Sequence, residues 1–252
     1  MNARTARLRQ ESLDAIPTIS AERALLLTEF YRENLGRLPT PLLRARSFHD
    51  LCARKKLWLG EGELIVGERG PFPKAVPTYP ELTCHSVEDL RILDSRPKTW
   101  YRVAPEVIAA YEETVIPFWR GRSMRDQLFP ALPPEWHAAY GAGVFTEFME
   151  QRAPGHTVLD DKVYRKGMNA FRRDIAAALA ALDFERDPEA IDRREELLAM
   201  DVSCEALVLF AERHAALAEE KAAVEPDEAR RAELLKIAEV CRRVPAEAPR
   251  GF

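Results

Sequence analysis

Apolar residues recur at helical spacing along most of the chain. Ala24, Leu27 and Tyr31 form one such stripe. This spacing places them on a single face of an α-helix. Ser20 is a good N-cap for that helix, and Gly36 is a suitable end. The pattern therefore predicts a first helix from Ser20 to Gly36.

A second helix is predicted to open at Thr40-Pro41, because proline is favoured at the first helical position. Ala45, Phe48 and Cys52 line its predicted inner face. The helical spacing of apolar residues ends after this helix. The short apolar run between glycines then predicts a strand or extended segment around Glu63 to Val66. The stretch from Gly70 to Pro80 contains four prolines, which predicts an extended loop with no regular element.

Helical spacing resumes in the rest of the chain. We expect helices at 86–93, 105–116, 124–129, 162–182 and 188–223, and a last helix that opens at Glu225-Pro226-Asp227. The three C-terminal ones have predicted buried faces made of Phe171, Ile175, Leu179 and Leu182, of Leu198, Val202, Leu209 and Phe210, and of Leu234, Ile237, Ala238 and Cys241. The fold class predicted from the residues is mainly α.

The segment FTEFMEQRAPGHTV, residues 145–158, is the main candidate for chemistry. Pro133 to Trp136 looks like the entrance to the helix that carries Glu147 to Arg152. Pro154-Gly155 suits the central positions of a type II turn, since proline sets the first φ and glycine accepts the positive second φ. That turn would hold His156 on a stiff corner, where its ring can donate or accept a hydrogen bond to a small molecule.

Structural readings of these residues remain open from the sequence alone. From the residues alone, His156 is suited to cap a neighbouring helix or to bond a buried carbonyl, and Phe148 is suited to core packing. Glu147, Glu150, Gln151 and Arg152 can form an ion-pair network. Asp160-Asp161 can be a metal pair or the acidic start of the next helix.

Composition and charge narrow the functional classes. The 252 residues are 46% hydrophobic and 31% charged, with a net charge of −4, which is typical of a globular protein. Nothing in this charge points to nucleic acid, and no apolar run is long enough to cross a membrane. We expect a cytoplasmic location. Cys52, Cys84, Cys204 and Cys241 form no CxxC pair, so neither a disulfide framework nor a zinc site is expected. A thiol–imidazole pair at Cys84-His85 is disfavoured because adjacent side chains rarely point the same way.

Several stretches resemble the glycyl radical enzymes of the pyruvate formate-lyase superfamily. They are ISAERALLLTE, GELIVGE, VPTYPELTCHSVEDL, IPFWRGR, the Glu-Trp pair at Trp136, GVFTEFMEQRAPGHTV and IAEVCRRVPAEAP. The ERA and ELIVG elements occur widely in that superfamily. The combination of PTYPE, EDL and TEFMEQRAPGHT is more particular and is most similar to the trans-4-hydroxy-L-proline dehydratases.

The resemblance implies a fold, a reaction and two site residues. The fold would be the helical N-terminal portion of a ten-stranded α/β barrel, with one or two short strands, and residues 1–252 would form an incomplete pyruvate formate-lyase-like domain. The reaction would be radical elimination of water from hydroxyproline, with a glycyl radical installed by an S-adenosylmethionine-dependent activating enzyme. By position, Phe148 and His156 would line the substrate pocket. The superfamily commonly forms homodimers.

The departures from the family pattern are equally informative. The sequence lacks the Gly-rich cysteine loop and the C-terminal RVxGY motif, and Gly251 is not a match for the latter. We therefore expect no catalytic residue and no directly bound cofactor or metal in this chain, and no turnover by the chain alone. Its end, RVPAEAPRGF, looks like a lead into a further structural unit. Two alternatives stay open: a glycyl radical lyase for another substrate such as glycerol or isethionate, and a non-catalytic helical binding fragment. Helices made to cover a barrel should also leave an apolar patch, so the chain alone is expected to be marginally stable.

Overall fold

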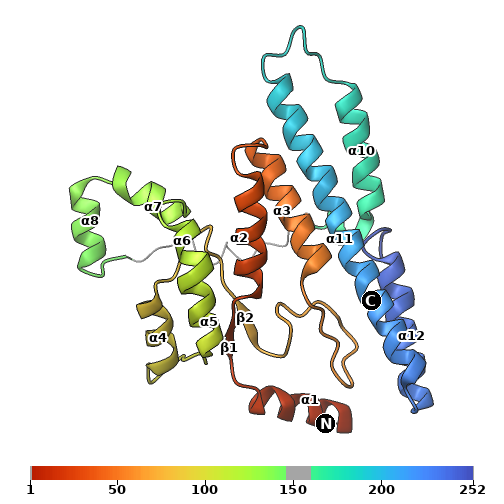
Figure 1. The fold of residues 1–252 in the computed structure, drawn as a ribbon. Helices are drawn as coiled ribbons and strands as arrows, with labels where there is room; N and C mark the ends of the chain where they lie inside the picture. Colours follow the sequence, from red (N-terminus) through yellow and green to blue (C-terminus); the bar gives the residue numbers. More distant parts are fainter. Residues whose placement is uncertain (1, 146–159, 252) are drawn as a thin grey trace. The chain divides into compact units, whose positions relative to one another are not determined.

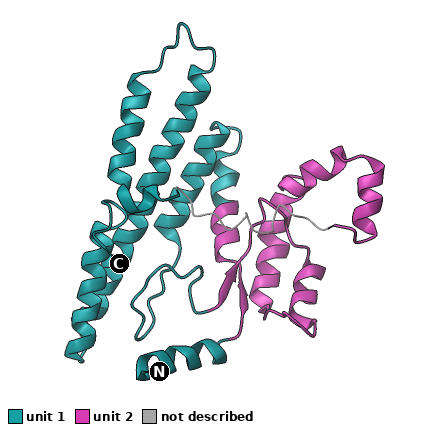
Figure 2. Ribbon diagram, turned by 180° about the vertical axis from the view of Figure 1, so that it is seen from behind, with its two compact units in different colours: residues 1–15, 29–73, 158–252 teal, residues 16–28, 74–157 magenta. Residues whose placement is uncertain are grey.

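The computed structural model describes residues 2–145 and 160–251. These residues fall into two units (Figure 2). Unit 1 comprises residues 1–15, 29–73 and 158–252, and unit 2 comprises residues 16–28 and 74–157. The described elements are almost entirely helices, with two short strands (Figure 1), so the expected fold class is confirmed.

Unit 2 contains both strands. Strand β1 (Thr18–Ser20) pairs in parallel with β2 (Ala75–Pro77), with Ile19 opposite Val76. Residue Arg102 lies on the other edge of β1, where Ile19 N donates to Arg102 O at 2.8 Å. The prediction that 70–80 holds no regular element is therefore wrong. A proline lacks only the donor of its own position, so it is tolerated at the end of a short strand such as β2.

The first predicted helix is α2 (Glu22–Asn34), with Ala24 and Leu27 buried as expected. Its start is later than predicted, because Ser20 belongs to β1. The Ser20 hydroxyl still accepts from Glu22 N, at 3.4 Å. Helix α4 (Val87–Ser95) begins with a capping box, in which Ser86 and Asp89 each bond the other's backbone N–H.

The predicted helix 105–116 is divided. It consists of α5 (Pro105–Ala110), a π-helical turn (Tyr111–Val115) and α6 (Ile116–Trp119). Pro117 lacks the N–H that an α-helix needs at that position, and its ring crowds the carbonyl four residues earlier. The wider π-turn, in which Ile116 N donates to Tyr111 O, accommodates this proline.

Helices α7 (Met124–Leu128) and α8 (Pro134–Gly141) follow, joined through a 3₁₀ turn (Phe129–Ala131). The prediction that the helix entered at Pro133–Trp136 carries Glu147 to Arg152 is wrong in part. Helix α8 ends at Gly141, and Gly143 takes a φ of +74° that favours glycine. The later part of that predicted helix lies outside the described residues.

Unit 1 is built around one long helix, α11 (Ala190–Val224), which is predicted almost to the residue. It contacts α3 (Thr40–Arg54), α10 (Met168–Ala180) and α12 (Glu228–Arg243). In Figure 1, α10 lies beside the first half of α11 and α12 beside the second half. Helix α12 opens with Asp227 as its N-cap, where the carboxylate accepts from Arg230 N at 2.6 Å.

The buried seam of α11 differs from the predicted stripe. Leu198, Val202, Leu209 and Phe210 are only half-buried, whereas the fully packed positions are mostly alanines: Ala199, Ala206, Ala215, Ala218 and Ala222. Small side chains allow three neighbouring helices to approach one helix closely. Phe48 of α3 is likewise more exposed than predicted, at 38%, while Ala45 and Cys52 are buried as expected.

The predicted helix 162–182 is broken into α9 (Lys162–Arg165) and α10. The break falls at Gly167, where the backbone of residues 246–247 lies so close that an added Cβ would be 2.4 Å from Ala246 O. Met168 N and Asn169 N donate to Pro245 O and Ala246 O, at 2.8 and 3.0 Å. The C-terminal segment therefore satisfies N–H groups that the start of α10 leaves free.

Residues 55–73 form an irregular segment without a strand. Of the two structures predicted for Glu63 to Val66, the strand is therefore wrong, and the extended segment remains. Among the described residues, no strand pairs with the short apolar run Leu64–Val66. Helix α1 (Ala3–Asp14) was not predicted, because it has no buried residue and hence no apolar stripe. It rests on local capping by Asn2 and on ion pairs from Arg4 to Glu233 and from Arg7 to Glu61.

In the ranges 2–145 and 160–251, none of the helices combines the length and apolar character that a bilayer crossing requires.

Candidate functional site

The two predicted substrate-binding residues, Phe148 and His156, lie outside the described residues. So do their neighbours Glu147 and Arg152 and the turn Pro154-Gly155. The structure therefore describes the chain that leads into this segment and the chain that follows it.

An aromatic cluster in unit 2 leads into the segment. The ring of Phe145 lies 5.4 Å from Trp136 and 5.7 Å from Tyr140, between centroids. Tyr140 in turn meets Phe129 edge-on at 4.9 Å. The guanidinium of Arg125 lies over both partners, 4.4 Å from the Phe129 ring and 5.6 Å from the Tyr140 ring. Such edge-on and cation–π contacts add stabilisation beyond burial, so three residues before Phe148 the backbone is anchored.

This cluster was missed by sequence reasoning, which treated the region only as the entrance to a helix. A signal was present in the spacing of Trp136 and Tyr140, four residues apart on one helical turn. Phe145 joins them only because the chain reverses at Gly143, and that reversal cannot be read from a periodic pattern.

The chain that follows the segment begins with two aspartates. Asp161 precedes α9 and pairs with Arg165, whose Nη2 donates to Oδ1 at 2.8 Å. Asp160 has a φ of +54°. This favours the helix-start interpretation over a metal pair. Among the residues that the structure describes, no three His, Cys, Asp or Glu side chains gather where they could hold a metal ion.

A partly buried polar frame in unit 2 is made of residues from two of the resemblance motifs. Arg23, from ERA, forms a two-pronged ion pair with Glu81, from PTYPE, at 2.5 and 3.0 Å. Its Nη1 also donates to Thr78 O at 3.0 Å, and its guanidinium stacks 4.0 Å from the centre of the Tyr79 ring. A planar guanidinium suits both contacts, so lysine could not replace it.

The same frame contains a buried phenol. Tyr111 is fully buried and donates from its hydroxyl to Thr78 Oγ1 at 2.6 Å. Burial raises the pKa of this phenol well above its ordinary value, so Tyr111 stays neutral and acts as a structural donor.

The cysteines are not poised for chemistry in this chain. Burial raises the pKa of the Cys52 thiol to about 11 and of Cys84 to about 12, and it raises those of Cys204 and Cys241 as well. The thiolate is the reactive form, so these thiols are inert at neutral pH. The Cys84 sulfur lies 3.8 Å from the carbonyl oxygen of His85, which gives no thiol–imidazole pair.

Comparison with known proteins gives the decisive observation. A family model for pyruvate formate lyase-like proteins matches residues 1–252, the whole chain. The chain belongs to the pyruvate formate lyase-like family.

Curated relatives of this PFL-like chain include the trans-4-hydroxy-L-proline dehydratase of Clostridioides difficile, which is 46% identical over 249 residues. That alignment covers 99% of this chain and 32% of the dehydratase. The isethionate sulfite-lyase of Desulfovibrio desulfuricans is 32% identical, over 94% of this chain and 30% of that enzyme.

Solved structures agree with the sequence matches. The hydroxyproline dehydratase from C. difficile, determined with trans-4-hydroxy-L-proline bound, superposes with a TM-score of 0.94 and covers 99% of this chain and 32% of that one. The B12-independent glycerol dehydratase of Clostridium butyricum superposes with a TM-score of 0.91 at 26% identity, over 100% of this chain and 32% of that one. The resemblance to glycyl radical enzymes is thereby confirmed, and the helical fold matches the N-terminal portion of theirs. The PFL-like chain spans about a third of the length of these relatives.

Proposed function

We propose that this PFL-like chain is the N-terminal portion of a glycyl radical dehydratase that eliminates water from trans-4-hydroxy-L-proline to give a pyrroline-5-carboxylate. The observation that supports this substrate is the 46% identity to the C. difficile dehydratase over almost the whole chain. Identity falls to 32% for an isethionate sulfite-lyase and to 26% for a glycerol dehydratase. Those two relatives define the alternative, a glycyl radical lyase for another small substrate.

In this proposal, Phe148 and His156 line one wall of the substrate pocket. A benzyl side chain can pack against the ring methylenes of hydroxyproline, and an imidazole can hydrogen-bond its hydroxyl or carboxylate. Phe145, held by Trp136 and Tyr140, anchors the backbone shortly before Phe148. This rigid support favours precise placement of pocket residues.

The radical chemistry belongs to other parts of the enzyme. A glycyl radical, installed by an S-adenosylmethionine-dependent activating enzyme, would supply the hydrogen-abstracting power. The sequence contains neither the RVxGY motif nor the Gly-rich cysteine loop, and burial or partial burial raises the pKa of each of the four thiols it does contain. The residues of this chain therefore bind and orient substrate and do not carry the radical.

A chimeric enzyme tests the proposal. This chain replaces the aligned third of the C. difficile dehydratase, and the product is activated anaerobically and assayed with hydroxyproline, glycerol and isethionate. We expect turnover of hydroxyproline alone. His156→Ala and Phe148→Ala should each lower kcat/KM by roughly 10²-fold or more, since misplacement of a bound substrate has effects of that size.

A matched control separates a pocket role from general damage. Phe184→Ala removes a benzyl side chain from a 56% exposed position outside the aromatic cluster and should leave kcat/KM unchanged. Equal activity in the wild-type chimera, His156→Ala and Phe148→Ala would remove both residues from the site. Turnover of glycerol or isethionate in place of hydroxyproline would reject the substrate.

A further inference from the structure

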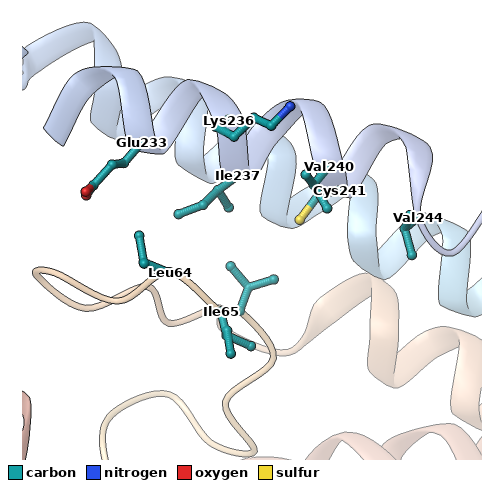
Figure 3. A pocket seen from close by; sticks show the side chains of 9 residues that line it. Leu64, Ile65, Glu233, Lys236, Ile237, Val240, Cys241 and Val244 are labelled. Atoms are coloured by element: carbon teal, nitrogen blue, oxygen red, sulfur yellow. The ribbon is translucent and has the colours of Figure 1, made fainter. Parts of the chain in front are cut away.

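Unit 1 carries an apolar groove that the proposed activity does not use. It is a pocket of about 500 Å³ lined on one side by Leu64, Ile65 and Val66 and on the other by α12. Figure 3 shows Leu64 on the loop facing the helix, where Ile237, Val240 and Cys241 lie opposite, and Ile65 next to it on the same loop. Ile65 is 87% exposed, Leu64 51% and Val240 46%. Three adjoining aliphatic side chains thus face solvent.

The groove is held open by a polar clamp behind the loop. Arg230, at the start of α12, donates to Glu63 O at 2.9 Å and to Gly60 O at 3.2 Å. The Glu63 carboxylate accepts from Gly60 N at 2.6 Å, which closes the loop on itself. These bonds fix the loop backbone at Gly60 and Glu63, directly before Leu64 and Ile65. The exposed aliphatic pair therefore follows an anchored stretch of backbone.

The charges at the rim are already paired. Glu233 bonds Arg4 and Arg230, and Lys236 lies 2.8 Å from Glu239. Small-molecule sites normally combine an apolar lining with a few convergent polar groups that orient the ligand. Here the nearest polar groups are engaged with one another, so the groove suits an apolar polypeptide surface better than a metabolite.

We propose that this groove docks an apolar segment from the remainder of the glycyl radical enzyme, the two-thirds of the relatives' length that this chain does not span. The proposal rests on the proposed function, since it requires the chain to act within such an enzyme. The length of the relatives supports this occupant: they share the fold of this chain and add about twice its length to it. An exposed cluster of aliphatic side chains on a rigid loop is the expected form of a surface that further polypeptide covers.

Thiol accessibility tests the docking directly. Leu64→Cys places a reporter at the rim of the groove without adding charge, and Arg186→Cys places one at a charged, exposed position outside it. Both variants are labelled with a maleimide in the 252-residue chain and in the chimera with the C. difficile dehydratase. We expect the ratio of Leu64→Cys to Arg186→Cys labelling rates to fall by about tenfold or more in the chimera, because docking must open before the thiol reacts.

A second variant tests whether docking at the groove stabilises the chimera against thermal unfolding. Ile65→Asp introduces a charge at the most exposed groove position. It should leave the melting temperature of the 252-residue chain unchanged and lower that of the chimera, since only there does the charge become buried. Val224→Asp, at an 81% exposed aliphatic position outside the groove, is the matched substitution.

Two results would overturn the docking proposal. One is an equal Leu64→Cys labelling ratio in the chain and the chimera together with no extra effect of Ile65→Asp. The other is slow labelling in the 252-residue chain alone, with a dimer in light scattering that Ile65→Asp dissociates, which would assign the groove to a second copy. A chimera that protects Leu64→Cys but does not turn over hydroxyproline would keep the groove and reject the proposed function.

Discussion

Replacing Thr28 with valine isolates a single buried hydrogen bond in unit 2. Thr28 is completely buried and Trp119 is 3% exposed. The indole Nε1 of Trp119 donates to Thr28 Oγ1 at 2.8 Å, and that hydroxyl donates onward to Ala24 O at 2.6 Å. Valine has almost the same shape as threonine, so the substitution removes the acceptor and leaves the packing in place.

The expected cost follows from what is left unpaired. The carbonyl of Ala24 keeps its bond within α2, but the indole N–H of Trp119 loses the Thr28 acceptor at a site where the side chain is only 3% exposed. An unsatisfied buried donor costs about 1–3 kcal/mol. For a chain of this size, a loss of about 2 kcal/mol corresponds to a fall of roughly 4–8 °C in melting temperature.

A double-mutant cycle with Trp119→Phe measures the bond itself. Thermal unfolding followed by circular dichroism would be compared for Thr28→Val, Trp119→Phe and the double variant. Once the indole has been removed, Thr28→Val no longer breaks the Trp119–Thr28 hydrogen bond. The loss in free energy of unfolding of the double variant should therefore be smaller than the sum of the two single losses, by roughly 1–2 kcal/mol. Additive effects, or a Thr28→Val variant as stable as the wild type, would refute the reasoning.

Three further perturbations follow from local geometry. Gly167→Ala should destabilise by about 1–3 kcal/mol in denaturant unfolding, because its Cβ would overlap Ala246 O, whereas Gly141→Ala, in open space, should not. Burial lowers the pKa of the His214 imidazole, whereas the imidazole of the unfolded chain keeps a pKa of about 6.5. The unfolded state therefore binds protons that the folded state excludes, and the free energy of unfolding should fall as the pH drops below about 6.5. His214→Gln should make this fall smaller. Cys84, with a pKa of about 12, should react with iodoacetamide at pH 7 about 10³-fold more slowly than an ordinary thiol, and rapid labelling would contradict its burial.

Helices with strong local signals were predicted well. Proline at the first turn of α3, the serine before α4 and the Glu-Pro-Asp run before α12 mark their helix starts by chemistry that acts within a few residues. The long α11 was predicted from another local property, because most of its residues are good helix formers.

The candidate site was identified by motif, and its pocket residues remain a prediction. Phe148 and His156 rest on resemblance and on turn chemistry. The polar contacts described in unit 2 were beyond sequence reasoning, because the Arg23–Glu81 ion pair joins residues 58 positions apart. Arg23 and Glu81 each belong to a motif identified in the sequence, but neither motif indicates that the two residues form an ion pair.

Capping, helix propensity and motif identity are properties of neighbouring residues, so the helical class, most helix starts and the PFL-like family could be predicted from the amino-acid order. Which faces are buried and which elements pair depends on contacts in the folded chain. Ala75–Pro77 becomes a strand because Thr18–Ser20 supplies its partner, and Glu63–Val66 does not become one because, in the part of the chain that the structure describes, no strand pairs with it. Gly167 interrupts a good helical pattern because the backbone of residue 246 occupies the space that a side chain would need. In each case the deciding contact comes from residues far away in the chain, so its energy is absent from any local pattern.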